Sequence, residues 1–161
     1  PLQGRRVLIL GAGGATRGAL LPMLAQGPAE VVIVNRTVAK AEELADLARQ
    51  HQSASVPVRG VGYADLGAET FDVVFNATSA SLTAELPPLS PAVFAPGCLA
   101  YELAYGKGLT PFLKLAQQAG VTRLADGVGM LAEQAAEAFE WWRGVRPDTA
   151  AVIEKLTVPL V

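Results

Sequence analysis

A glycine cluster between an apolar run and a helical pattern constrains the fold most strongly. Residues Val7 to Gly18 read Val-Leu-Ile-Leu-Gly-Ala-Gly-Gly-Ala-Thr-Arg-Gly. This pattern predicts a strand, a tight turn and a helix, the arrangement that holds a pyrophosphate against a helix N-terminus. Gly11 would make the turn, Gly13 would leave room for a phosphate, and Gly14 would open the helix. Thr16 stands where the dinucleotide-binding fingerprint has its third glycine, so this motif alone leaves a purely structural glycine turn open.

Apolar runs of strand length alternate with helical patterns along the whole chain. Strands are expected near residues 6–10, 31–34, 56–61, 72–76, 98–103 and 121–124, and helices near residues 14–26, 38–50, 110–119, 129–143 and 149–156. Strands that are apolar on both faces predict a parallel sheet covered by helices on both sides. We therefore expect an α/β fold, a Rossmann-like doubly wound sheet of about six strands in the order 3-2-1-4-5-6. Residues 1–161 are expected to form a single domain.

The end of the second apolar run distinguishes between two dinucleotides. In an NAD site a carboxylate here would bind the ribose 2′-hydroxyl, but this run is followed by Asn35, Arg36 and Thr37, with Lys40 one turn on. Arg36 can bind a 2′-phosphate in bidentate fashion while Asn35 and Thr37 donate to it. Cations at a helix N-terminus are unfavourable unless an anion accompanies them. The residues therefore favour NADP over NAD, the alternative being that Arg36 and Lys40 are simply solvated.

Composition excludes several classes of function. A hydrophobic content of 51% and a net charge of −2 argue against disorder and against a nucleic-acid-binding surface. One histidine and one cysteine leave nothing from which to build a metal site. No apolar stretch approaches the length of a membrane span, and Cys98 lies inside an apolar run as a buried structural thiol would. We therefore expect a cytoplasmic protein that binds neither membrane nor metal.

Polar residues follow the fourth and fifth predicted strands, where ligands of such sheets bind. Asn76, Thr78 and Ser79 follow the fourth strand, and they either line a cofactor or form an ordinary polar loop. Tyr105 and Lys107 follow the fifth strand among glycines, which allow close approach to a ligand. A loop lysine is usually solvated, so no catalytic role is expected for Lys107.

The last long helical pattern carries an apolar stripe and a glutamine. The stripe consists of Ala135, Ala138, Phe139 and Trp142, and its spacing predicts a face packed into the core. From the periodicity alone, Gln134 is expected on the surface.

Five short segments carry a resemblance to a known family. They are Gly-Ala-Gly-Gly-Ala at 11–15, Asn-Arg-Thr at 35–37, Asn-Ala-Thr-Ser at 76–79, Tyr-Gly-Lys-Gly-Leu-Thr-Pro-Phe-Leu at 105–113 and Asp-Gly-Val-Gly-Met-Leu-Ala-Glu-Gln-Ala at 126–135. In this order they resemble the NADP lobe of the shikimate dehydrogenases, over essentially the whole chain. That family reduces 3-dehydroshikimate to shikimate with NADPH, on the route through chorismate to the aromatic amino acids. Its fold pairs an N-terminal substrate lobe with a C-terminal NADP lobe.

The resemblance implies a role for each matching residue. The pyrophosphate would be held by Gly11, Ala12, Gly13, Gly14 and Ala15. The adenosine 2′-phosphate would face Asn35, Arg36, Thr37 and Lys40. Thr78 and Ser79 would line the cofactor, while Leu103 and Gly127 would meet the nicotinamide through their backbone; Leu103 stands where the family often has methionine. Tyr105 and Gln134 would reach the substrate, which replaces the surface interpretation of Gln134.

The resemblance also implies that something is missing. The family's catalytic lysine and aspartate belong to the N-terminal lobe, and hydride transfer to a ketone needs a positioned proton donor. We therefore expect an NADP(H)-binding fragment of a two-domain oxidoreductase, without a catalytic residue of its own. It would meet shikimate or 3-dehydroshikimate only when joined to the other lobe.

Two alternatives stay open. One is the NADP lobe of a related quinate-type or other hydroxy-acid reductase, and the other is a non-catalytic NADP-binding module. The apolar wall that would face the other lobe would also permit a homodimer.

Overall fold

The computed structural model describes residues 1–52, 55–80, 85–106 and 108–160. In these ranges, six parallel strands form one sheet in the order β3-β2-β1-β4-β5-β6, so both the predicted fold and the strand order are confirmed. The strands are β1 (Arg6–Leu10), β2 (Glu30–Val34), β3 (Val58–Val61), β4 (Phe71–Asn76), β5 (Phe94–Glu102) and β6 (Arg123–Ala125).

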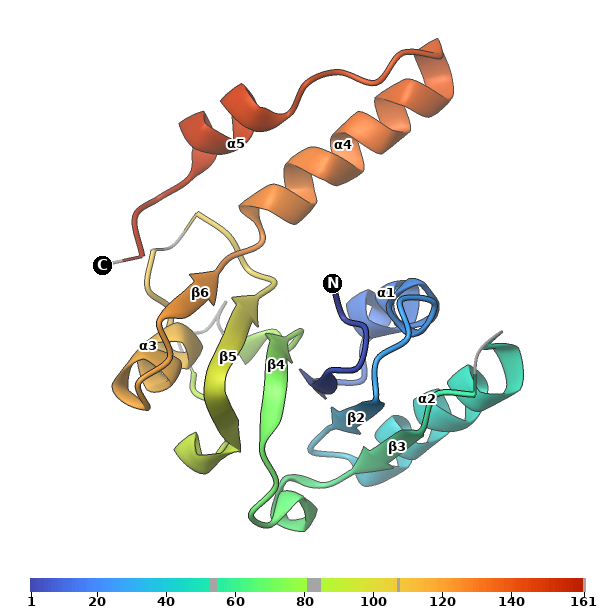
Figure 1. The fold of residues 1–161 in the computed structure, drawn as a ribbon, viewed down its shortest axis with the longest axis vertical. Coiled ribbons are helices and arrows are strands. Elements are labelled where there is room, and N and C mark those ends of the chain that lie inside the picture. Colours follow the sequence, from blue (N-terminus) through green and yellow to red (C-terminus); the bar gives the residue numbers. More distant parts are fainter. Residues whose placement is uncertain (53–54, 81–84, 107, 161) are drawn as a thin grey trace.

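Within the described residues, five α-helices connect or follow the strands (Figure 1). They are α1 (Gly14–Leu24), α2 (Val38–His51), α3 (Pro111–Gln118), α4 (Val128–Arg143) and α5 (Ala150–Leu156), with short 3-10 turns η1 at Tyr63–Leu66 and η3 at Pro91–Val93. The predicted boundaries hold to within a few residues, except that β5 begins at Phe94. The strand passes through Pro96 and Gly97, residues that usually interrupt strands, with a shift of register against β4 and a positive φ of 75° at Gly97. In the part of the chain that is described, no helix is both long and apolar enough to span a membrane.

Successive strand residues face opposite sides of the sheet, and both sides are buried. Val7 and Ile9 of β1 pack with Leu20 of α1 in the core beneath α1 and α2. Leu8 of β1 packs with Phe112 of α3 in the core on the other side. This two-sided burial explains why the strands are apolar at every position rather than at alternate ones.

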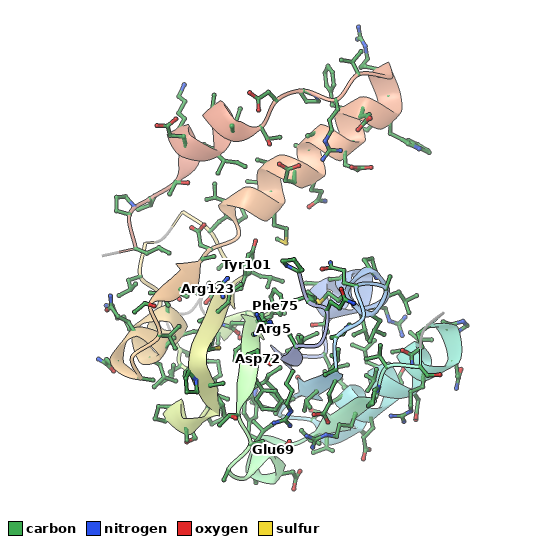
Figure 2. All side chains as sticks on the ribbon, in the orientation of Figure 1. Arg5, Glu69, Asp72, Phe75, Tyr101 and Arg123 are labelled. Carbon is green, nitrogen blue, oxygen red and sulfur yellow. The ribbon has the colours of Figure 1, made fainter. Side chains whose placement is uncertain are left out.

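Charged residues join the strands at the amino end of the sheet. Arg6 contacts Glu30 at 3.0 Å and Glu69 at 2.6 Å, and Arg59 bonds to the same two carboxylates, at 2.8 Å in the case of Glu30. We call these four residues the amino-end ionic cluster. Glu69 lies at the opposite end of the sheet from Tyr101 (Figure 2), so this cluster is remote from the carboxyl ends of the strands, where ligands bind.

Helices α4 and α5 form a hairpin that projects away from the sheet (Figure 1). Arg146, in the connection between them, bonds to Glu133, Glu137 and Glu140 of α4 at 2.6–3.0 Å and so joins that connection to α4. The prediction that the apolar stripe of α4 lies in the core is wrong for this chain, because Phe139 is 46% and Trp142 74% exposed. Periodicity predicts an apolar face, but the sheet of this chain does not cover it.

Candidate functional site

The carboxyl ends of β1, β2 and β4 meet around a cavity of about 340 Å³. It is lined by Gly11, Ala12, Gly13, Asn35, Arg36, Tyr63, Ala77, Thr78, Ser79, Ala80, Glu85, Leu86, Pro87 and Pro88. The structure therefore brings together the glycine turn, the residues after β2 and the residues after β4, as the sequence predicts for a doubly wound sheet.

Gly11 is a glycine because the fold requires one. Its φ is +100°, and a Cβ added there would lie 3.1 Å from Cγ2 of Thr78 and 3.2 Å from the carbonyl oxygen of Ala77. The turn is closed from below by Thr16, whose buried hydroxyl donates to the carbonyl oxygen of Gly11 at 2.6 Å. Thr16, where the fingerprint has a glycine, thus stabilises the turn with a hydrogen bond that glycine could not make.

Gly13 and Gly14 are not required by the fold. Gly13 has φ of −94°, which any residue can adopt, and a Cβ at either glycine would meet no protein atom within 4 Å. Gly13 caps α1 without a side-chain hydrogen bond, and no acidic residue stands in the first turn. The N–H groups of that turn have no carbonyl partner within the helix and carry the positive end of its dipole. This is an open cradle suited to an anion.

Asn35 organises the loop after β2. Its Oδ1 accepts a hydrogen bond from the N–H of Ala12 at 3.3 Å, and its Nδ2 donates to the carbonyl oxygen of Thr37 at 2.9 Å. The side chain of Asn35 therefore connects the glycine turn to the residues that follow β2. The sequence predicts only a phosphate-binding role for Asn35.

Arg36 and Lys40 lie exposed beside the cradle. Arg36 lines the main cavity, whereas Lys40 lines a neighbouring one of about 260 Å³ with Gly13, Gly14 and Arg17. Within the described ranges, neither cation forms an ion pair. Burial raises the pKa of Tyr63, and the nearby Arg36 charge opposes that shift, so this phenol borders the arginine. Positive charge at the cavity mouth is thus available to a ligand.

Buried polar groups join the loops after β4 and β5. The side chain of Asn76 is buried, not exposed to the cavity, and its Oδ1 accepts from the hydroxyl of Thr78 at 2.7 Å. Its Nδ2 donates to Oε2 of Glu102, also fully buried, at 2.9 Å. Thr78 therefore lines the cavity while its hydroxyl is fixed by the hydrogen bond to Asn76. Ser79, beside it, is exposed.

Leu103 and Gly127, predicted to share a nicotinamide contact, lie against each other. The N–H of Gly127 donates to the carbonyl oxygen of Ala104 at 3.2 Å, and a Cβ on Gly127 would fall 2.1 Å from the carbonyl oxygen of Leu103. Only glycine permits this approach. Nearby, the rings of Phe75 and Tyr101 lie on neighbouring strands (Figure 2), with centroids 5.4 Å apart.

The structure does not bring the two predicted substrate residues into the cavity. Tyr105 is 49% exposed on the loop after β5, and Gln134 is exposed on the projecting helix α4. Lys107 lies outside the described residues. Among the residues that are described, no group of three histidine, cysteine, aspartate or glutamate side chains could hold a metal ion.

Sequence reasoning missed part of the cavity wall. Tyr63 follows β3, whose carboxyl end borders the same edge of the sheet, so strand order could have indicated it. Glu85, Leu86, Pro87 and Pro88 come from the long connection before β5, and nothing in their sequence signals a cavity.

Comparison with known families identifies the chain. Residues 1–84 match the family described as shikimate / quinate 5-dehydrogenase, and residues 127–157 match the shikimate 5′-dehydrogenase C-terminal domain. The chain belongs to the shikimate/quinate 5-dehydrogenase family. The resemblance carried by the five sequence segments is therefore confirmed.

Relatives of this family are similar over nearly all of the chain. A shikimate dehydrogenase (NADP(+)) of Dechloromonas aromatica (strain RCB) is 53% identical over 160 residues, which cover 99% of this chain and 57% of the relative. An Ael1 enzyme from Pseudomonas putida, known from a crystal structure, is 63% identical in sequence and superposes with a TM-score of 0.91. The match covers 100% of this chain and 58% of that enzyme. The 5-ketofructose reductase of Gluconobacter sp. strain CHM43 is 31% identical with a TM-score of 0.78, over 96% and 56%. The chain thus spans little more than half the length of these three proteins.

Proposed function

We propose that this chain is the NADP(H)-binding lobe of a shikimate dehydrogenase, an oxidoreductase that reversibly reduces 3-dehydroshikimate to shikimate in aromatic amino acid biosynthesis. One observation carries the proposal: two cations that form no ion pair among the described residues, Arg36 and Lys40, flank the glycine cradle, and no carboxylate directly follows β2. The NADP(+)-dependent dehydrogenase named among the relatives supports the same assignment.

The cofactor would lie along the carboxyl ends of the strands. Its pyrophosphate would sit on the first turn of α1, where Gly13 and Gly14 leave open space and the helix dipole favours negative charge. Its 2′-phosphate would bind Arg36 and Lys40, with Thr37 beside them. When bound, NADPH supplies the hydride, and Thr78, Leu103 and Gly127 orient the ring from which it leaves.

The reaction needs more than these residues supply. A ketone that accepts a hydride also needs a proton donor within hydrogen-bond reach. Tyr105 is 49% exposed and is not among the residues that line the cavity. We therefore propose that residues 1–161 act as one domain joined to a second lobe, which supplies acid–base chemistry and covers the substrate. Tyr105 and Gln134 would then contact the substrate across the junction.

The exposed apolar face of α4, which includes Phe139 and Trp142, would pack against that second lobe. In an isolated chain the same face would favour a homodimer. Burial raises the pKa of the Cys98 thiol to about 11, which keeps this buried thiol protonated at neutral pH.

A related reductase with a different hydroxy-ketone substrate is the second candidate, because the 5-ketofructose reductase is 31% identical over 96% of this chain. The cofactor lobe would be the same in both cases. A panel of shikimate, quinate and polyols, tested with the full-length enzyme, separates the two by the ratio of their kcat/KM values.

The test of the cofactor assignment is a pair of calorimetric titrations, with NADPH and with NADH, on the parent chain and on Arg36→Ala. NADPH should bind the parent at least about tenfold more tightly than NADH, since a charge-assisted bidentate contact contributes more than 1.4 kcal/mol, roughly one decade of affinity. Arg36→Ala should remove that preference, whereas Arg5→Ala, an exposed arginine before β1, should keep it. Equal affinity for the two cofactors in the parent would contradict the proposal.

A further inference from the structure

A fully buried carboxylate lies between the two loops that would hold the cofactor's reactive end. Glu102 is the last residue of β5 and pairs in register with Asn76, the last residue of β4. Neither side chain is exposed to solvent. A buried glutamate is expensive unless hydrogen-bond donors surround it, so its presence at this point of the sheet calls for an explanation.

Donors from both loops reach Glu102. Its Oε2 accepts from Nδ2 of Asn76 at 2.9 Å and from the hydroxyl of Thr110 at 3.0 Å, and its Oε1 accepts from the N–H of Ala104 at 3.2 Å. Thr110 also caps α3 by accepting from the N–H of Leu113. The carboxylate therefore joins the end of β4, the loop after β5 and the start of α3.

The same network continues into the cavity wall. Asn76 Oδ1 accepts from both the N–H and the hydroxyl of Thr78, at 3.2 and 2.7 Å. The backbone carbonyl of Asn76 accepts from the N–H of Leu103 at 3.0 Å. The hydrogen bonds of Asn76 and Glu102 thus fix the position of Thr78 on one side and of Leu103 on the other.

We infer that Glu102 is a positioning residue that sets the spacing between the loop carrying Thr78 and the loop carrying Leu103, and through them the seat of the nicotinamide ring. This inference rests on the proposed function and assigns a residue to it that touches neither cofactor nor substrate. It follows that Glu102 governs binding of the nicotinamide half of NADPH and leaves the adenosine half unaffected, because the latter lies on the other side of β1.

Glu102→Gln is the direct perturbation. The side chain keeps its size, but an amide places N–H groups where the carboxylate accepts, so a donor faces Asn76, Thr110 or Ala104. We expect the dissociation constant for NADPH to rise about tenfold, the loss typical of one displaced charge-assisted hydrogen bond. The constant for ADP-ribose 2′-phosphate, which lacks the nicotinamide, should change less than about twofold. If Glu102 only stabilised the fold, Glu102→Gln would weaken the binding of both ligands by the same factor.

A swapped double variant tests the contact itself. In Asn76→Asp with Glu102→Gln, the amide and the carboxylate exchange places, so the bond between β4 and β5 is restored with reversed polarity while Thr78 keeps its acceptor. NADPH affinity should recover most of the loss seen in Glu102→Gln alone. If Glu102→Gln does not fold, Thr110→Val removes one donor at the same carboxylate and should show the same selective effect.

The outcomes separate this inference from the proposed function. If the parent chain binds neither ligand, the proposed function fails. If the parent binds both but Glu102→Gln weakens neither, or weakens both by the same factor, the positioning role is overturned while the proposed function stands. Equal constants for the two ligands in the parent also overturn it, because the loops would then contribute nothing to nicotinamide binding.

Discussion

Alanine at two neighbouring glycines should separate what the fold needs from what the ligand needs. At Gly13 the backbone conformation suits alanine, and the added methyl meets no protein atom within 4 Å. Gly13→Ala should therefore change the free energy of unfolding by less than about 1 kcal/mol, because the lower entropy of the unfolded chain and the poorer N-cap preference of alanine oppose each other. The methyl would, however, occupy the space of the pyrophosphate. NADPH affinity should fall at least about tenfold, or 1.4 kcal/mol.

Gly11→Ala should do the opposite. A positive φ of 100° costs an alanine about 1–2 kcal/mol. The contacts at 3.1 and 3.2 Å with Thr78 and Ala77 add about 1–3 kcal/mol of overpacking. The total of about 2–5 kcal/mol corresponds to a fall in Tm on the order of 10 °C, at about 2–4 °C per kcal/mol for a chain of this size.

Thermal unfolding without ligand and an NADPH titration of each folded variant measure the two effects separately. The reasoning is refuted if Gly13→Ala lowers Tm as far as Gly11→Ala, or if it binds NADPH as tightly as the parent.

Two further predictions concern stability alone. A Cβ at Gly60 would lie 2.1 Å from the carbonyl carbon of Ala41, so Gly60→Ala must push α2 away from β3. The free energy of unfolding in urea should fall by at least about 3 kcal/mol. The control is Gly18→Ala, at a helical glycine with open space around it, which should be neutral or stabilising; equal losses of stability in the two variants would contradict the close packing at Gly60. In the amino-end ionic cluster, a hydrogen bond from Arg59 lowers the pKa of Glu69, so its contribution to stability is present above its usual value near 4.5 and is lost as the pH falls through the lower folded value. The Tm should therefore fall more between neutral pH and about pH 3 in the parent than in Glu69→Gln, with most of the difference appearing below the usual pKa of 4.5, and parallel pH profiles would argue against it.

The parts of the fold that depend on local pattern were predictable from the sequence. Strands such as Val31–Val34 are apolar at every position because helices cover both faces, and that pattern alone indicates a parallel sheet. The start of β5 was not predictable, because Pro96 and Gly97 signal a break and the register shift that accommodates them depends on β4. A proline and a glycine indicate that a strand is interrupted, but whether the strand ends there depends on its pairing with the neighbouring strand.

The site shows the same division. That Gly11, Gly13 and Arg36 line one cavity was predictable, because their neighbours in sequence reveal the turn and the strand end. Glu102 was not, since a glutamate at a strand end reads as solvated, and its burial follows only from partners 26 residues before it and eight after it. The prediction that the stripe containing Phe139 is buried was wrong for a related reason: periodicity identifies an apolar face of a helix but not the surface that covers it.

The central claim is that this chain holds NADP at the carboxyl ends of β1 and β2, and a crystal structure of the chain with NADP⁺ tests it most directly. The account predicts the pyrophosphate on the first turn of α1 beside Gly13, and the 2′-phosphate within hydrogen-bond distance of Arg36. Density for the cofactor at another edge of the sheet, or a 2′-phosphate turned away from Arg36 into solvent, would contradict it.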